Sequence, residues 1–147
     1  MNISDIMTDK NVFIGIKANT KRELLQELAN RAAALTGLDE RTLFDTLLER
    51  ENLGSTGFGS GTAMPHGRFS GLDKVTAVFV RTASPVDFGA VDGRPVDLVW
   101  TLFSPEDSGA DHLTALAKIS RILKDETLCA KLRQASSPLE IFALLNS

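Results

Sequence analysis

The sequence predicts a single α/β domain over residues 1–147, with three α/β/α layers in which a mixed β-sheet carries helices on both faces. Three observations favour this fold. Short β-branched runs alternate with stretches of helical periodicity, and the last third of the chain is helical throughout. A chain of 147 residues is long enough for one core but too short for two ordinary domains.

The first predicted elements are a strand and two helices. Val12–Ile16 is a short apolar run that is partly β-branched, which predicts a strand. Thr20 and Glu23 have the spacing of a capping box, and leucines at helical intervals continue to Gly37, a typical helix stop. Asp39 opens a second helix. The inner face of that helix carries four apolar side chains, Leu43, Phe44, Leu47 and Leu48.

Strands are predicted in the middle of the chain. Apolar residues alternate loosely from 75 to 82, and residues 85–88 have the composition of a short edge strand. Asp92-Gly93 is a strong turn signal. Residues 95–103 form a nearly continuous apolar run, which predicts a strand buried on both faces. Asp97 interrupts this run, and its carboxylate either orients a histidine or caps the end of the strand.

Three helices complete the predicted fold. The first begins near Asp111, the second at Asp125, and the third at Ser137-Pro138, where serine is the N-cap and proline takes the first helical position. Helical spacing predicts a core stripe on the first of them, made of Leu113, Leu116, Ile119, Ser120 and Leu123. The other two are expected to bury Leu128, Leu132, Ile141, Leu144 and Leu145.

Composition and charge exclude several classes of function. The net charge is −3 and there is no basic tract, which argues against nucleic-acid binding. Cys129 is the only cysteine, so no intramolecular disulfide can form, and a reducing cytosol fits best. The N-terminus lacks the pattern of a secretion signal, and no apolar run approaches the length of a membrane span. We therefore expect a cytoplasmic protein that does not insert into a membrane.

The most informative segment is the glycine loop, residues 54–61, which leads into His66. Four of its eight residues are glycine, so backbone N–H groups such as those of Gly57 and Gly59 are free to point at an anion. An imidazole can itself carry a phosphoryl group. Arg50 and Arg68 flank the segment with permanent positive charge. Hydroxyl donors are supplied by Ser55, Thr56, Ser60 and Thr62. The segment predicts a histidine site that handles an anion.

Known motifs for other chemistries do not fit the glycine loop. A nucleotide-binding P-loop ends in Gly-Lys-Ser/Thr, whereas this loop ends in Gly61-Thr62-Ala63. The glycine spacing also fails the dinucleotide fingerprint, and no Gly-x-Ser-x-Gly elbow exists. The two histidines and Cys129 stand apart in the sequence, which gives no metal-ligand pattern. We therefore expect no metal and no cofactor.

Three classes of function are compatible with these residues. The first is a phosphotransfer protein with His66 as the covalent carrier, the second is a non-catalytic binding module whose loop docks a partner, and the third is a hydrolase with His66 as general base. The hydrolase lacks a nucleophile, a metal and a carboxylate paired with His66. His112 lies in the first turn of a predicted helix, and a site role and the role of a surface or half-buried capping histidine are both open for it.

The segment from Arg50 to Gly67 resembles the signature of the enzyme IIA domain of the mannitol/fructose type, from the bacterial phosphoenolpyruvate-dependent phosphotransferase system. The matching pattern is Arg50-Glu51, then Gly54-Ser55-Thr56-Gly57-x-Gly59-x-Gly61-x-Ala63-x-Pro65-His66-Gly67. The similarity extends over nearly the whole chain. It includes Asp92-Gly93-x-Pro95-Val96-Asp97-Leu98, and His112-Leu113 opening a helix after Pro105.

The resemblance implies a phosphocarrier that accepts a phosphoryl group from the phosphohistidine of an HPr-type carrier protein. Nε2 of His66 is the implied acceptor, His112 is the second active-site histidine, and Arg50 is the arginine that precedes the loop. Ser55 and Thr56 occupy the positions that contact the phosphoryl group in the family. Around this site, Phe58, Phe69 and Arg68 are candidates for the rim that docks a partner. The alternatives for them are core packing for the phenylalanines and a solvated loop charge for Arg68.

Two branches of this family remain open. In the nitrogen-regulatory branch, the phosphorylation state controls binding to regulatory target proteins. In the sugar-specific branch, enzyme IIA passes the phosphoryl group to an enzyme IIB domain during uptake. The loop sequence Gly-Ser-Thr-Gly-Phe-Gly, and a chain without a fused sugar-binding, membrane or carrier domain, favour the nitrogen-regulatory branch.

Overall fold

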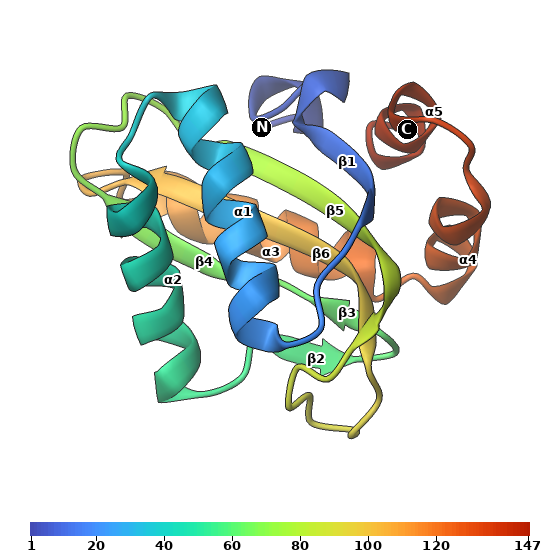
Figure 1. Cartoon of the computed structure of the whole chain (residues 1–147). Coiled ribbons are helices and arrows are strands. Elements are labelled where there is room, and N and C mark those ends of the chain that lie inside the picture. Colours follow the sequence, from blue (N-terminus) through green and yellow to red (C-terminus); the bar gives the residue numbers. More distant parts are fainter.

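The computed structural model describes residues 1–147 and confirms an α/β fold with a mixed sheet between two layers of helices (Figure 1). The strand order is β1-β5-β6-β3-β2, and β4 pairs with β6 as well. β5 and β6 are antiparallel, whereas β1 pairs with β5, and β3 and β4 with β6, in parallel. β6 therefore carries β5 along one side and β3 followed by β4 along the other.

The strands are β1 (Val12–Ile16), β2 (Gly57–Gly59), β3 (Thr62–Ala63), β4 (His66–Phe69), β5 (Thr76–Val86) and β6 (Val96–Pro105). The helices are α1 (Lys21–Thr36), α2 (Glu40–Leu53), α3 (Ala110–Leu123), α4 (Glu126–Gln134) and α5 (Pro138–Leu145). Two short 3₁₀ turns, η1 (Ile3–Asp5) and η2 (Asp9–Asn11), precede β1. No helix combines the length and apolar character needed to cross a membrane.

The predicted helix starts are confirmed by their caps. Thr20 accepts a hydrogen bond from the backbone N–H of Glu23 at 3.1 Å. The Glu23 carboxylate accepts from the N–H of Asn19 at 2.8 Å and not from that of Thr20, so only half of the predicted capping box forms. The side chains of Asp39, Asp125 and Ser137 cap α2, α4 and α5 in the same way. Gly37 ends α1 in the left-handed conformation, at φ 77°.

The strand prediction is wrong in two places. Residues 85–88 do not form a separate edge strand, because Pro85 and Val86 end β5, where Val86 pairs with Val96 of β6. The register shifts between Arg81 and Val86, and β1 pairs with β5 only as far as Thr82, so a proline fits in the stretch that follows. The short strands β2, β3 and β4 are also absent from the sequence prediction.

The core lies on both faces of β5 and β6, whose side chains alternate between them. α1 and α2 cover one face, and α3, α4 and α5 pack on the other (Figure 1). On the α3 face, the rings of Phe79 and Trp100 meet edge to face with centroids 5.9 Å apart. On the α1–α2 face, Phe69 of β4 packs against Phe103 at 5.5 Å.

The predicted core stripe of α3 is partly wrong. Leu113 is 65% exposed, whereas Ala115 and His112 are buried together with the predicted Ile119 and Leu123. The stripe thus starts one residue earlier than predicted, and one residue corresponds to about 100° around a helix. The first turn of α3 therefore directs His112, and not Leu113, towards the sheet.

Candidate functional site

The fold brings His66 and His112 together, with ring centroids 5.8 Å apart. His66 starts β4, which runs parallel to β6 with His66 opposite Leu102 and Arg68 opposite Ser104. Alternate residues of a strand share one face, and here that face is covered by α3. His112, in the first turn of α3, therefore meets the ring that β4 presents.

His66 is held in one tautomer by its own backbone. Nδ1 lies 2.9 Å from the carbonyl oxygen of Met64. Because a carbonyl can only accept, Nδ1 carries the proton, and Nε2 of the neutral ring keeps its lone pair. Burial lowers the pKa of His66 below its usual value, the charge of Arg50 lowers it further, and the bond to Met64 and the charge of Glu51 oppose this. The neutral, nucleophilic form is therefore favoured.

His112 is more deeply buried than His66, at 6% exposure. Its Nδ1 lies 2.6 Å from the hydroxyl oxygen of Ser104. Burial, followed by the positive charges of Arg68 and of a protonated His66, lowers the pKa of His112 to about 4. The ring is consequently neutral near pH 7. The alternative of a surface or half-buried capping histidine is wrong, because His112 is buried and its Nδ1 bonds to Ser104 of β6, and a role in phosphoryl transfer stays a prediction.

Each of the two predicted arginines acts on a different histidine of the pair. Arg50, in the last turn of α2, donates to the carbonyl of Gly54 at 2.9 Å, and its charge acts on His66. Its contact with Gly54 also gives it the structural role of a cation at a helix C-terminus. Arg68 is exposed and donates to the hydroxyl of Ser108 at 3.2 Å, while its charge acts on His112.

The polar groups of the glycine loop mostly bond within the protein. The Ser55 hydroxyl donates to the carbonyl of Phe88 and accepts from the N–H of Gly57, both at 3.0 Å. The N–H and hydroxyl of Thr56 donate to the carboxylate of Glu51. Direct contact of Ser55 and Thr56 with a phosphoryl group, as predicted, would require these bonds to rearrange. In this structure the two side chains support the loop itself.

Glu51 is a site residue that the sequence pattern does not identify. Glu51 is 5% exposed. Its carboxylate accepts hydrogen bonds from the N–H of Thr56 at 3.0 Å and from Nζ of Lys21 at 2.8 Å. A buried carboxylate needs such partners to offset its lost hydration. The available signal was its place in the motif directly after Arg50, but an acidic residue near the end of a helix is usually solvated.

The tip of the β2–β3 hairpin is fixed by Ser60, which has φ 56°. Its N–H donates to Asp92 at 2.9 Å, its hydroxyl donates to Glu126 at 3.2 Å, and its carbonyl accepts from Arg133 at 2.8 Å. Arg133 also pairs with Asp97 at 2.9 Å. Asp97 therefore neither orients a histidine nor caps a strand, so both alternatives given for it are wrong. It instead binds Arg133, which donates to the carbonyl at the tip of the hairpin.

The predicted rim divides between surface and core. Phe69 is 4% exposed and belongs to the core, whereas Phe58 is half-buried and packs against the core beside α3. Two exposed leucines, Leu53 at the end of α2 and Leu113 at the start of α3, were not predicted for the rim. With Arg68 and Phe58 they are the candidates for partner contact around the histidine pair.

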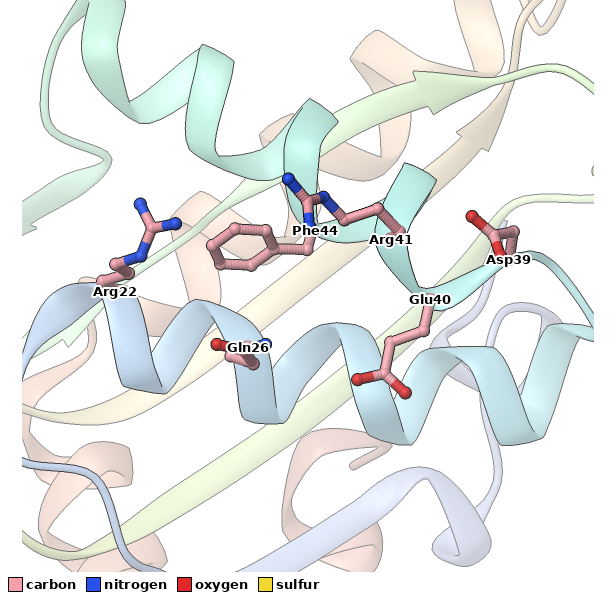
Figure 2. A pocket seen from close by; sticks show the side chains of 6 residues that line it. All are labelled: Arg22, Gln26, Asp39, Glu40, Arg41 and Phe44. Carbon is pink, nitrogen blue, oxygen red and sulfur yellow. The ribbon is translucent and has the colours of Figure 1, made fainter.

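A surface hollow lies elsewhere, between α1 and the start of α2 (Figure 2). Its lining is formed by Arg22, Gln26, Asp39, Glu40, Arg41 and Phe44. None of the predicted site residues lines this hollow. The structure contains no group of three or more His, Cys, Asp or Glu side chains arranged to hold a metal ion.

Comparison with known proteins gives a match along the chain. Residues 5–147 match the family described as phosphoenolpyruvate-dependent sugar phosphotransferase system, EIIA 2. A nitrogen regulatory protein of Bradyrhizobium diazoefficiens is 46% identical over 145 residues, which cover 99% of this chain and 95% of the relative. A fructose-specific EIIA component of Haloferax volcanii is 36% identical over 119 residues, which cover 80% of this chain and 77% of the relative.

Solved structures of enzyme IIA proteins are similar to this fold. The nitrogen regulatory protein IIA-Ntr from Neisseria meningitidis has a TM-score of 0.92 at 34% identity and covers 97% of this chain and 98% of its own. Enzyme IIA for mannitol from Escherichia coli, in complex with phosphorylated enzyme IIB, has a TM-score of 0.79 at 25% identity, with coverage of 95% and 96%.

Proposed function

The chain belongs to the EIIA 2 family of the phosphoenolpyruvate-dependent sugar phosphotransferase system, and we propose that it carries a phosphoryl group covalently on Nε2 of His66. It is a phosphocarrier of the nitrogen-regulatory branch, as its 46% identity to a nitrogen regulatory protein supports. The observation that carries the proposal for His66 is the bond between Nδ1 and the Met64 carbonyl. This bond leaves Nε2 as the nucleophile, beside a second histidine.

Phosphoryl transfer to His66 needs no net proton movement. The lone pair of Nε2 attacks phosphorus, the N–P bond of the donor phosphohistidine breaks, and its electron pair returns to the donor ring. The Nδ1 proton of His66 stays in place and remains bonded to the Met64 carbonyl, which stabilises the positive charge that the ring acquires. The protein thus contributes mainly position and charge, as phosphoryl transfer requires.

The groups around His66 take complementary roles in this proposal. Arg50 supplies positive charge near the phosphoryl oxygens. His112, neutral and 5.8 Å away between ring centroids, supplies a hydrogen bond from Nε2. The glycine loop holds the segment before His66 through the bond from the Met64 N–H to the Thr56 carbonyl. The N–H of Gly57 already donates to the Ser55 hydroxyl, so Gly59 is the loop glycine to which we assign a backbone contact with the phosphoryl group. Ser55 and Thr56 support the loop first.

The proposed donor is an HPr-type phosphocarrier protein, which docks around the exposed edge of His66. Leu113 follows His112 directly and Leu53 lies in the last turn of α2 with Arg50, and at 65% and 83% exposure both can contact a partner. Arg68 adds an exposed charge that an acidic partner would meet. The proposed recipients of the signal are regulatory target proteins. Because a carrier must share a compartment with its donor, and Cys129 is unpaired, we place the protein in the cytoplasm.

A labelling experiment tests the proposal. The full chain is incubated with phosphoenolpyruvate, enzyme I and an HPr-type carrier, and its intact mass is measured. We expect the gain of one phosphoryl group that is labile in acid and stable in base, and no gain in His66→Ala. The control is Thr114→Ala, an exposed position on α3 that leaves the acceptor intact and should label like the wild type. Absence of labelling in the wild type, or labelling that persists in His66→Ala, would overturn the proposal.

A sugar-specific role is the second candidate, favoured by the 36% identity to a fructose-specific EIIA component. It predicts that labelled protein passes its phosphoryl group on to an enzyme IIB domain. The nitrogen-regulatory role predicts stable label in the presence of enzyme IIB, and capture of regulatory targets that differs between the labelled wild type and His66→Ala. A non-catalytic binding module predicts no label at all.

A further inference from the structure

Ser104 makes a contact with the site to which the proposed function gives no role. Ser104 lies near the end of β6, is 0% exposed, and stands opposite Arg68 in the register of β4 and β6. Its hydroxyl oxygen lies 2.6 Å from Nδ1 of His112. A hydroxyl and a neutral imidazole can form this bond in two ways, with either group as the donor. The two ways leave opposite chemistry at Nε2 of His112.

The number of acceptors available to the Ser104 hydroxyl proton decides between the two arrangements. The Ser104 hydroxyl has no hydrogen-bond partner other than His112, and its burial keeps it from bulk water. If Nδ1 were the donor, the hydroxyl proton would be buried without an acceptor, which costs free energy. If the hydroxyl is the donor, Nδ1 and Ser104 are both satisfied. The ring proton of His112 then resides on Nε2.

Nε2 of His112 is available for a ligand. It forms no hydrogen bond within the chain, and it is not among the unpaired side-chain atoms that are sealed from solvent. Those sealed atoms are Arg31 Nε, Thr82 Oγ1, Trp100 Nε1 and Thr101 Oγ1. An unpaired nitrogen that reaches solvent 5.8 Å from the centre of the His66 ring can therefore contact a group bound there.

Building on the proposed function, we propose that Ser104 is a positioning residue: its hydroxyl donates to Nδ1 of His112 and holds the ring proton on Nε2, where it donates to a phosphoryl oxygen on His66. The opposite tautomer would direct a lone pair at a phosphoryl group of negative charge, and the two would repel. Because His112 has a pKa of about 4, its ring cannot supply this donor by protonation near pH 7. The tautomer alone decides whether it attracts or repels.

The same principle applies with opposite sign at His66. There the Nδ1 partner is the Met64 carbonyl, which can only accept, so the proton is kept on Nδ1 and Nε2 is nucleophilic. At His112 the Nδ1 partner is a hydroxyl with no other acceptor, so the proton is kept on Nε2. Two neighbouring histidines thus act as acceptor and donor because their backbone and side-chain partners differ.

The tautomers can be measured directly in the full chain. Nitrogen-15 NMR of the ring nitrogens, through their couplings to ring protons, distinguishes Nδ1–H from Nε2–H. We expect Nε2–H at His112 and Nδ1–H at His66 in the wild type near pH 7. An Nδ1–H signature at His112 overturns the role of Ser104. This measurement does not depend on labelling. If the protein failed to accept a phosphoryl group, the proposed function would be contradicted, but the NMR result would still show the direction of the Ser104 bond.

Substitutions test the consequence for transfer. Ser104→Ala should lose the single tautomer at His112 and slow labelling of His66 about tenfold, the worth of one hydrogen bond to a charged group. Ser104→Thr, which keeps the hydroxyl, should restore both. The matched control is Thr101→Val, which removes another buried hydroxyl of β6 that has no partner, and it should label like the wild type. Wild-type labelling and tautomer in Ser104→Ala overturn the inference.

A double substitution separates positioning from a purely structural role. In a His112→Ala background, Ser104→Ala should cause no further loss of rate, because Ser104 acts only through the ring. An additional loss as large as in the wild-type background would show that Ser104 acts independently of His112, and it would overturn the inference.

Discussion

The glycine loop and the histidine pair are both rich in polar groups, but they use these groups differently. In the loop, the hydroxyls of Ser55 and Thr56 are hydrogen-bonded to other parts of the chain. Each histidine instead bonds through Nδ1 alone and leaves Nε2 unpaired. A polar group that is already satisfied holds structure, whereas one that is unpaired and reachable can react. The contrast separates a scaffold from the atoms that carry out the chemistry.

The two regions should therefore respond differently to substitution. Changes in the bonds that support the loop should appear mainly in the free energy of unfolding. Changes at the histidines and at Arg50 should appear mainly in the rate of phosphoryl transfer. Three substitutions test this division, and a result in the wrong category would break it.

The largest effect is expected for Glu51→Gln. The substitution removes the charge that balances Lys21 and replaces an acceptor of Thr56 with an amide. We expect the free energy of unfolding to fall by about 3 kcal/mol, since the buried N–H and hydroxyl of Thr56 lose a charged acceptor and the half-buried Lys21 loses its partner. Urea denaturation measures this. The control is Glu49→Gln, an exposed residue of the same helix, which should stay within about 0.5 kcal/mol of the wild type. A Glu51 variant as stable as this control contradicts the scaffold role.

The next effect is expected for His112→Ala in the labelling assay. Loss of one preorganised donor to the phosphoryl oxygens should slow labelling of His66 about a hundredfold. The fold should persist, which circular dichroism can check. Thr114→Ala, an exposed position on the same helix, serves as the control and should label normally. An unchanged rate in the His112 variant would show that the second histidine is not part of the chemistry.

The smallest effect is expected for Arg50→Ala. Removing its charge should slow labelling about tenfold, because a half-buried cation near the phosphoryl group contributes less than a buried donor. Arg41→Ala removes an arginine of the same helix that pairs with Asp45 on the surface, and it controls for net charge. A large loss of stability with unchanged rate would assign Arg50 to the scaffold, through its bond to Gly54.

Much of the fold follows from the sequence because its elements are long and periodic. α1, from its Thr20 cap to its Gly37 stop, carries the helical signal over 16 residues. β6 is largely apolar and is buried on both faces except at Asp97, as predicted. By contrast, β2, β3 and β4 have three, two and four residues, too few to show a period of two. Their pairing with β6 and with each other is a tertiary effect that local pattern does not encode.

The site was predictable where its residues are defined by motif, and less so where they depend on three-dimensional neighbours. His66, His112 and Arg50 follow from the resemblance, and the structure brings them together. Glu51 and Ser104 are ordinary residue types for a helix end and a strand, and only their burial next to Thr56 and His112 shows what they do. The buried position of His112 in α3 likewise depends on how the helix packs on the sheet, which the sequence pattern does not show.

The three bonds of Ser60 have a thermodynamic consequence. Glycine loses more backbone entropy on ordering than any other residue, so a loop with four glycines is costly to immobilise. Here Asp92, Glu126 and Arg133 immobilise the tip of that loop in the protein without a phosphoryl group. The entropic cost falls on folding and not on each transfer. Amide hydrogen exchange at Ser60 should accordingly be slow, and the exchange rate should be nearly the same in the free and the phosphorylated protein.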